Sequence, residues 1–89
     1  MIEISFSTSF REAFKRKVRG NPTLEERFWE RVEIFENNPF DPRLRTHKLT
    51  GSMRDWWSFS IDYDLRVLFV FVEPGRALFG NIGTHDEVY

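Results

Sequence analysis

The sequence has 89 residues, of which 40% are apolar and 17% aromatic, enough apolar bulk for one small folded domain, 1–89, and too much for a disordered chain. The absence of cysteine excludes disulfide bonds, thiol catalysis and cysteine-ligated zinc. Thirteen basic against fourteen acidic residues give a net charge of −1, which argues against a polyanion recognised through overall charge, although basic residues gather in segments 11–19 and 43–48.

The N-terminal region predicts a strand and then a helix. Apolar and polar side chains alternate over residues 2–6, the pattern of a strand with one buried face. Hydroxyl residues follow at 7–9 as candidate N-caps. Phe10, Phe14 and Val18 then recur at steps of four, which places one apolar stripe on a helix and in the core.

A second helix is predicted after the Gly-Asn-Pro break at 20–22. Thr23 and Glu26 fit a capping box, with a hydroxyl at the N-cap and a carboxylate three residues later. Apolar residues recur at helical spacing over 24–35, and the Asn-Asn-Pro segment 37–39 ends the run. Two helices joined by so short a break predict a helical hairpin.

The rest of the chain is rich in strand-forming residues. Three or four strands are predicted over 44–49, 56–61, 67–72 and 78–82, and a Pro-Gly turn separates the last two. The resulting order, β-α-α-β-β-β, predicts an α+β domain in which the helical hairpin packs on a small, mainly antiparallel twisted sheet that includes the first strand. No apolar run is long enough for a membrane span or a signal peptide, so we expect a cytoplasmic protein with no membrane partner.

Two histidines are the candidate proton carriers. His85 follows the last predicted strand, and His47 lies in the basic segment; imidazole exchanges protons near neutral pH, which suits general acid and base catalysis. The alternative is that both are solvated surface residues. No phosphate-binding glycine loop and no zinc motif accompany them, so neither a cofactor nor a metal is expected.

Other polar residues near the predicted strands have two readings each. Arg66 opens an apolar strand, where its guanidinium could hold a phosphate or instead pair with Asp62, Asp64 or Glu73. The two aspartates flank a turn and are also typical turn formers. Trp56 and its neighbour point to opposite faces of a strand, so one indole belongs to the core and the other could be an exposed platform for RNA bases.

Four segments resemble the RelE/ParE superfamily of toxins from bacterial type II toxin-antitoxin systems, and its YafQ-like branch in particular. The element order agrees with that family over nearly the whole chain. The segments are His47-Lys48-Leu49-Thr50-Gly51, residues 57–61, residues 64–69 and Ile82-Gly83-Thr84-His85-Asp86-Glu87-Val88-Tyr89.

The resemblance implies a ribosome-dependent mRNA endonuclease that needs no metal, held inactive by a cognate antitoxin in an assembly that can be of higher order. In this family the 2′-hydroxyl attacks the adjacent phosphate and leaves a cyclic phosphate. By match to the family, His85 is the general acid, His47 and Asp64 are further active-site residues, Arg66 steadies the phosphate and Tyr89 is the terminal aromatic. Residues expected to contact RNA are Lys48, Arg54, Arg45 and Trp56.

The sequence also departs from the family pattern. Ser60 stands where YafQ-like toxins have another histidine, which leaves His47 or Asp64 as the proton acceptor, and Leu65 replaces an aromatic residue. The net charge of −1 is low for a family that is usually basic. The alternative functions are therefore a ParE-like gyrase inhibitor without nuclease activity, a weakened or inactive antitoxin-binding relative, and a plain partner-binding module.

Overall fold

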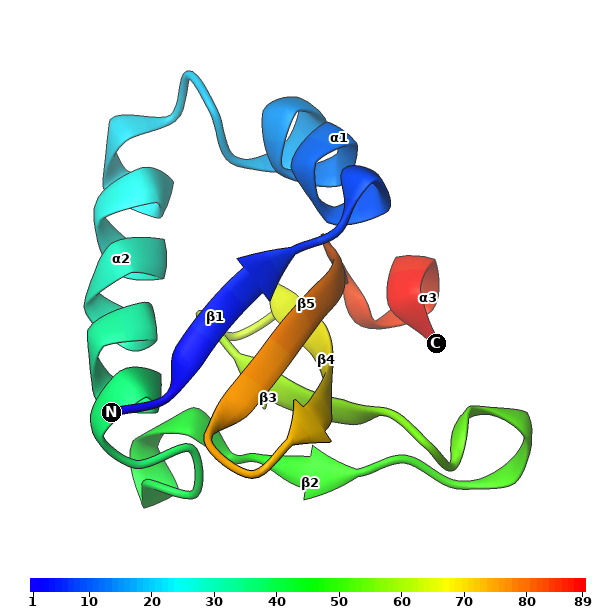
Figure 1. The fold of residues 1–89 in the computed structure, drawn as a ribbon. Coiled ribbons are helices and arrows are strands. Elements are labelled where there is room, and N and C mark those ends of the chain that lie inside the picture. Colours follow the sequence, from blue (N-terminus) through cyan, green and yellow to red (C-terminus); the bar gives the residue numbers. More distant parts are fainter.

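The chain forms one five-stranded mixed sheet, and the computed structural model describes all of residues 1–89 (Figure 1). The elements in chain order are β1 (Glu3–Phe6), α1 (Thr8–Lys17), α2 (Pro22–Asn37), η1 (Pro42–Leu44), β2 (His47–Lys48), η2 (Gly51–Met53), β3 (Trp57–Ser60), β4 (Arg66–Glu73), β5 (Arg76–Gly83) and α3 (His85–Val88). The strands lie side by side in the order β1-β5-β4-β3-β2. β1 runs parallel to β5 and every other pair is antiparallel, as predicted for a mainly antiparallel sheet that includes the first strand.

Helices α1 and α2 supply one side of a single hydrophobic core. Aromatic rings from both helices meet rings from β3, β4 and β5, and the buried ones are Phe10, Phe28, Phe35, Phe59, Phe69 and Phe79. Of the predicted stripe on the first helix, Phe10 and Val18 are buried and Phe14 is half-buried against the core. The helices therefore cover one face of the sheet, which we call the inner face.

The second helix begins two residues earlier than its predicted capping box. Asn21 is the N-cap, and its Oδ1 accepts from the Leu24 amide at 3.2 Å. Pro22 is the first helical residue, a position that tolerates proline because no amide donor is needed there. Thr23 and Glu26 therefore lie inside the first turn, and the prediction of a Thr23 N-cap was wrong.

The first predicted strand of the second half is shorter than expected. Its beginning forms the 3₁₀ turn η1, which buries Leu44 completely, and Arg45 then adopts a left-handed backbone with φ of 53°. Only His47 and Lys48 pair with β3. An apolar residue such as Leu44 is compatible with a strand or with a buried turn, and the sequence alone does not separate the two.

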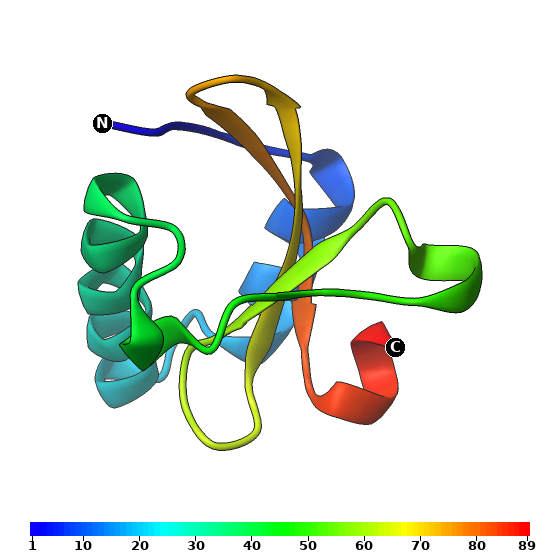
Figure 2. The same cartoon turned by 90° about the horizontal axis from the view of Figure 1, so that it is seen from below.

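The short C-terminal helix α3 was not predicted. It lies on the side of the sheet opposite α2, which we call the outer face (Figure 2). The Thr84 amide donates to Glu87 Oε1 at 2.8 Å, so the Thr-x-x-Glu pattern predicted at Thr23 operates at Thr84 instead.

The helices of this fold lack the length and apolarity that crossing a membrane requires.

Candidate active site on the outer face

Strand β3 sends its polar side chains to the outer face. Phe59 is fully buried in the core, so its neighbours Ser58 and Ser60 point the other way. The register places His47 opposite Ser58 and Arg66 opposite Ser60. Three strands thus present a histidine, two serines and an arginine on one surface.

Helix α3 is held against this surface by contacts of its last two residues. Val88 is buried and packs on Gly83, where an added Cβ would lie 3.2 Å from the valine side chain. Glu87 forms an ion pair with Lys17 of α1. Because these contacts fix α3, they also fix His85 at its start and Tyr89 just beyond its end.

Tyr89 brings the two histidines into one cluster. Its ring centroid lies 4.4 Å from that of His85 and 6.4 Å from that of His47, edge to face in both cases. The Tyr89 hydroxyl donates to Ser58 Oγ. The structure therefore brings together three residues named from the sequence, two of them near the C-terminus and one in the middle of the chain, and anchors them on a serine.

The contacts of the two imidazoles differ. His47 Nδ1 lies 3.1 Å from the backbone carbonyl of Arg45, a contact that a neutral ring makes by donating from Nδ1–H, which leaves Nε2 as a free acceptor. His85 Nδ1 lies 3.6 Å from Asp86 Oδ1, and its side chain is exposed. One ring is thus oriented to accept a proton at Nε2, and the other faces solvent beside a carboxylate.

Arg66 is tied to the same surface by Ser60. Its Nη1 donates to Ser60 Oγ at 2.7 Å, and no carboxylate pairs with it, so the alternative pairings with Asp62, Asp64 and Glu73 do not occur. Its Nε is buried without an acceptor. Ser60 lies two residues from Ser58 on the same face, so the arginine row is about 6.6 Å along the strand from the His47 row.

A pocket opens beside the cluster. It has a volume of about 390 Å³ and is enclosed by Leu49, Thr50, Gly51, Ser52 and Met53 on one side and by His85 and Tyr89 on the other. Gly51 has φ of 67°, a left-handed conformation that suits glycine and that turns the chain at this loop. The cluster therefore borders a concavity that a substrate group can enter.

Other residues named from the sequence lie outside the cluster. Lys48 is exposed and lies opposite Trp57 on the other face from His47, with Nζ 6.0 Å from the centroid of the Trp57 ring, and Arg54 is exposed directly after η2. Asp64 is exposed in the β3–β4 turn, with no side-chain hydrogen bond or ion pair. Its neighbour Asp62 holds that turn by accepting from the amides of residues 64 and 65 at 3.0 and 2.8 Å.

Neither Trp56 nor Trp57 is a freely exposed platform. Trp57 packs against the core beside Phe40 and Phe71. Trp56 is half-buried on the outer face and covers Gly80, where an added Cβ would lie 2.5 Å from the indole ring. The expectation that one of the two indoles is exposed is corrected: the glycine on β5 lets the outer ring lie flat against the sheet.

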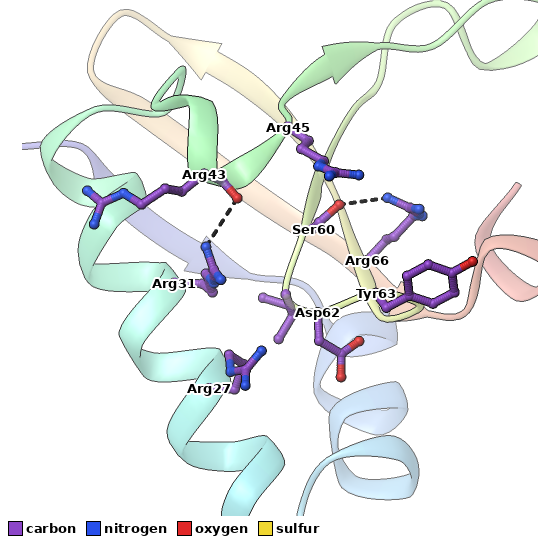
Figure 3. Close-up of a pocket in the computed structure, with 9 residues that line it drawn as sticks. Arg27, Arg31, Arg43, Arg45, Ser60, Asp62, Tyr63 and Arg66 are labelled. Atoms are coloured by element: carbon purple, nitrogen blue, oxygen red, sulfur yellow. Dashed lines mark hydrogen bonds between the residues drawn. The ribbon is translucent and has the colours of Figure 1, made fainter.

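A second pocket is lined by five arginines, of which only Arg45 and Arg66 were named as site residues from the sequence. It has a volume of about 260 Å³ at the end of the β3–β4 hairpin, next to Arg66 (Figure 3). Its arginines are Arg27, Arg31, Arg43, Arg45 and Arg66. Arg27 and Arg31 lie one turn apart on α2, but five glutamates in the same stretch of sequence masked them as a basic feature.

Comparisons with solved structures identify the fold. A metal-bound toxin from Helicobacter pylori matches with a TM-score of 0.79 at 21% identity, over 100% of both chains. A YoeB-YefM complex from Staphylococcus aureus matches with 0.76 at 16% identity, over 96% of this chain and 98% of that one. A DinJ-YafQ complex from Escherichia coli matches with 0.70 at 16% identity, over 100% and 99%.

No protein-family model matches the sequence, and neither does any curated protein. At these identities the structural matches show the fold. It is the fold of the RelE/ParE toxins, YafQ and YoeB among them, which the sequence motifs predicted.

Proposed function

We propose that this chain is the toxin of a type II toxin-antitoxin system and cleaves mRNA on the ribosome. The observation behind it is that His47 and His85 both pack on Tyr89, that His85 and Tyr89 line a pocket, and that Arg66 lies one row away on the same face. The matched solved structures support it, since they are toxins and toxin complexes of the same fold.

The residues supply an acid, a base and a cation for metal-independent cleavage. The 2′-oxygen attacks the adjacent phosphorus while its proton passes to the base, and the bond from phosphorus to the 5′-oxygen breaks as the acid protonates that oxygen. The products are a 2′,3′-cyclic phosphate and a free 5′-hydroxyl. Proton transfer by placed side chains contributes about 10²- to 10⁴-fold to such a rate.

We assign the base to His47. The Arg45 carbonyl holds the proton on Nδ1 and leaves Nε2 free to accept the 2′-hydroxyl proton. Asp64 was the other candidate, but its exposed position in the β3–β4 turn gives it no contact with the cluster. The general acid is then His85, packed against the Tyr89 ring.

Arg66 stabilises the charge that develops on the phosphate. Its planar guanidinium matches two phosphate oxygens, and Ser60 fixes the orientation of that group. The serine that replaces a family histidine therefore has a positioning role in this chain. Arg45, Arg54 and Lys48 are exposed cations that we assign to the RNA backbone outside the cluster.

The partner that restrains this activity is a cognate antitoxin. A groove of about 270 Å³ lies between β1, α1 and α2, lined by Phe6, Phe10, Arg11, Phe14, Arg19, Phe28 and Trp29. Its aromatic walls fit the apolar side of an amphipathic segment, and its two arginines fit acidic residues beside that segment. If an adjoining gene encodes an acidic protein, Trp29→Ala at this half-exposed position should weaken the complex with that protein. Val72→Ala, on the exposed side of β4, is the control and should leave the complex unchanged.

Induced expression with mRNA 3′-end mapping tests the enzyme proposal. The chain should arrest growth and cut a translated message, while leaving the same message uncut when its start codon is removed. His85→Ala should abolish both effects, and Glu26→Ala, an exposed change on α2, should preserve them. A His85→Ala protein that stays fully toxic and still cuts mRNA would refute the assigned role.

A supercoiling assay separates the proposal from gyrase inhibition. A ParE-like inhibitor would block gyrase and leave messages intact. Growth arrest with intact mRNA and inhibited supercoiling would therefore replace the nuclease proposal with the gyrase alternative, and no growth effect at all would favour a partner-binding relative.

A further inference from the structure

The pocket at the end of the β3–β4 hairpin holds far more positive than negative charge. We call it the arginine pocket, after Arg27, Arg31, Arg43, Arg45 and Arg66, which line it together with the β3–β4 turn. Only Arg43 forms an ion pair, with Asp41, and its guanidinium points away from the others (Figure 3). The single carboxylate of the lining, Asp62, is engaged by backbone amides of its own turn.

Two of the arginines that line this pocket hold a donor that is buried without an acceptor. These donors are the Nε atoms of Arg31 on α2 and of Arg66 on β4. Buried donors in folded proteins are nearly always paired, so two unpaired donors on guanidinium groups that line one pocket indicate a missing acceptor. An oxyanion with several acceptor oxygens, such as a phosphate, meets this requirement.

The rim of the pocket carries an exposed aromatic ring. Tyr63 is 96% exposed at the tip of the β3–β4 turn, so its ring is free to stack on a ligand bound beside it. Guanidinium groups beside a free ring are the combination that holds single-stranded nucleic acid, with phosphates on the cations and a base on the ring. An acidic peptide would use the arginines but would leave the ring without a function.

We propose that the arginine pocket is a second RNA site, which holds a backbone phosphate of single-stranded RNA while Tyr63 stacks on a neighbouring base. This inference deepens the proposed nuclease function and rests on it for the identity of the RNA as substrate. Arg66 belongs to both sites, so a strand bound at the His47–His85 cluster continues across it into the pocket. The pocket thus sets where the strand lies relative to the cleaved bond.

Fluorescence anisotropy with the full chain tests this site. The probe is a labelled 2′-O-methyl oligoadenylate of about eight nucleotides, within the length that one small domain covers. It lacks the attacking hydroxyl, so binding is measured without cleavage. Arg27→Gln and Arg45→Gln remove exposed guanidinium groups from the pocket, and Arg16→Gln on α1, which is exposed and unpaired, is the matched control.

Each pocket variant should bind the probe more weakly and with a smaller dependence on salt. The slope of log K against log salt should fall by about 0.7 for each phosphate that the variant no longer neutralises. Tyr63→Ala should weaken binding about 5- to 150-fold, which corresponds to about 1 to 3 kcal/mol per stacked base, while Tyr63→Phe keeps the ring and the affinity. Unchanged melting temperatures would show that the variants fold.

Three results would overturn the inference. They are equal weakening by Arg16→Gln, unchanged binding by the pocket variants, and displacement of the probe from the pocket by hexaglutamate at lower concentration than by unlabelled oligonucleotide. The outcome is separable from that of the nuclease proposal. Loss of probe binding in a chain that never cuts translated mRNA would uphold the pocket alone, and cleavage with unaffected probe binding would uphold the nuclease alone.

Discussion

The two faces of the sheet are made of different chemistry. The inner face is a nearly continuous layer of phenylalanine rings packed against α1 and α2. The outer face carries His47, Ser58, Ser60 and Arg66 and is covered only by the single turn of α3. Successive residues of a strand point to opposite faces, so residues that stabilise the core alternate with residues of the candidate active site along the same strands. Substitutions on the two faces should therefore have different consequences.

The largest expected effect on stability comes from the inner face. Phe35 is fully buried, and its ring lies 5.0 Å from Phe59 and 4.9 Å from Phe69. Phe35→Ala should lower the free energy of unfolding by about 3 to 5 kcal/mol, because apolar burial is removed and a cavity remains. Urea unfolding measures this, and a decrease under about 1 kcal/mol would contradict the assignment of this ring to the core.

The largest expected effect on activity comes from the outer face. His47→Ala should slow cleavage about 10²- to 10⁴-fold by removing the proton acceptor. Because His47 is exposed, the free energy of unfolding of the variant should stay within about 0.5 kcal/mol of that of the parent protein. Single-turnover cleavage on programmed ribosomes, paired with urea unfolding, checks both halves. If His47→Ala lowered the free energy of unfolding as well as the cleavage rate, the proposed difference between the two faces would be wrong.

Gly80 tests whether the outer face is packed as well as polar. A methyl group there would overlap the Trp56 ring, so Gly80→Ala should cost about 1 to 3 kcal/mol of unfolding free energy. In a Trp56→Ala background the same change should cost much less. The thermodynamic cycle of these variants gives the coupling, and additive effects would mean that the indole does not press on β5.

Ser60 tests whether positioning of Arg66 is separable from folding. Ser60→Ala removes the acceptor of the guanidinium and should cost about 0.5 to 1.5 kcal/mol in stability, with a fall in cleavage rate. Ser60→Thr keeps the hydroxyl and should retain most of the rate. Equal rates for the two variants, measured in the same ribosomal assay, would remove Ser60 from the site.

The smallest expected effect lies away from both faces, at the N-cap of η1. Hydrogen bonds from the Arg43 side chain, and then from its amide, lower the pKa of Asp41 to about 2 from 3.8. A lowered folded-state pKa stabilises the fold above the unfolded value, and this contribution is lost as the pH falls from about 4 to about 2. The melting temperature of Asp41→Asn should therefore lie below that of the parent at pH 6 and approach it at pH 2.

Local patterns in the sequence were enough to predict most elements. The alternation at the N-terminus, the two apolar stripes and the Pro-Gly turn indicated β1, α1, α2, β4 and β5 within two or three residues. The periodic spacing of apolar residues depends only on residues close together in the sequence, so it predicts strands and helices without a structure. The capping pattern was assigned to Thr23 instead of Thr84, because a pattern of two residues fits several places until packing selects one.

The candidate site depended on contacts between distant parts of the chain. His47 and His85 were named from the sequence as proton carriers, but only the pairing of β2 with β3 and the docking of α3 place them around one tyrosine. Ser58 carried no signal, since a serine in a strand is ordinary, and Ser60 was noted only as the residue that stands in place of a family histidine.

The sequence by itself determined which residues can be buried and which can carry protons or charge, because these are properties of side chains and their local spacing. Only the tertiary structure decided which of them meet. The arginine pocket is the clearest case: its residues come from α2, the segment around η1 and the two strands of the β3–β4 hairpin, and only the segment around η1 is basic when read along the chain. Charge density depends on distance in space, and that distance is fixed when the sheet register and the helix packing are fixed.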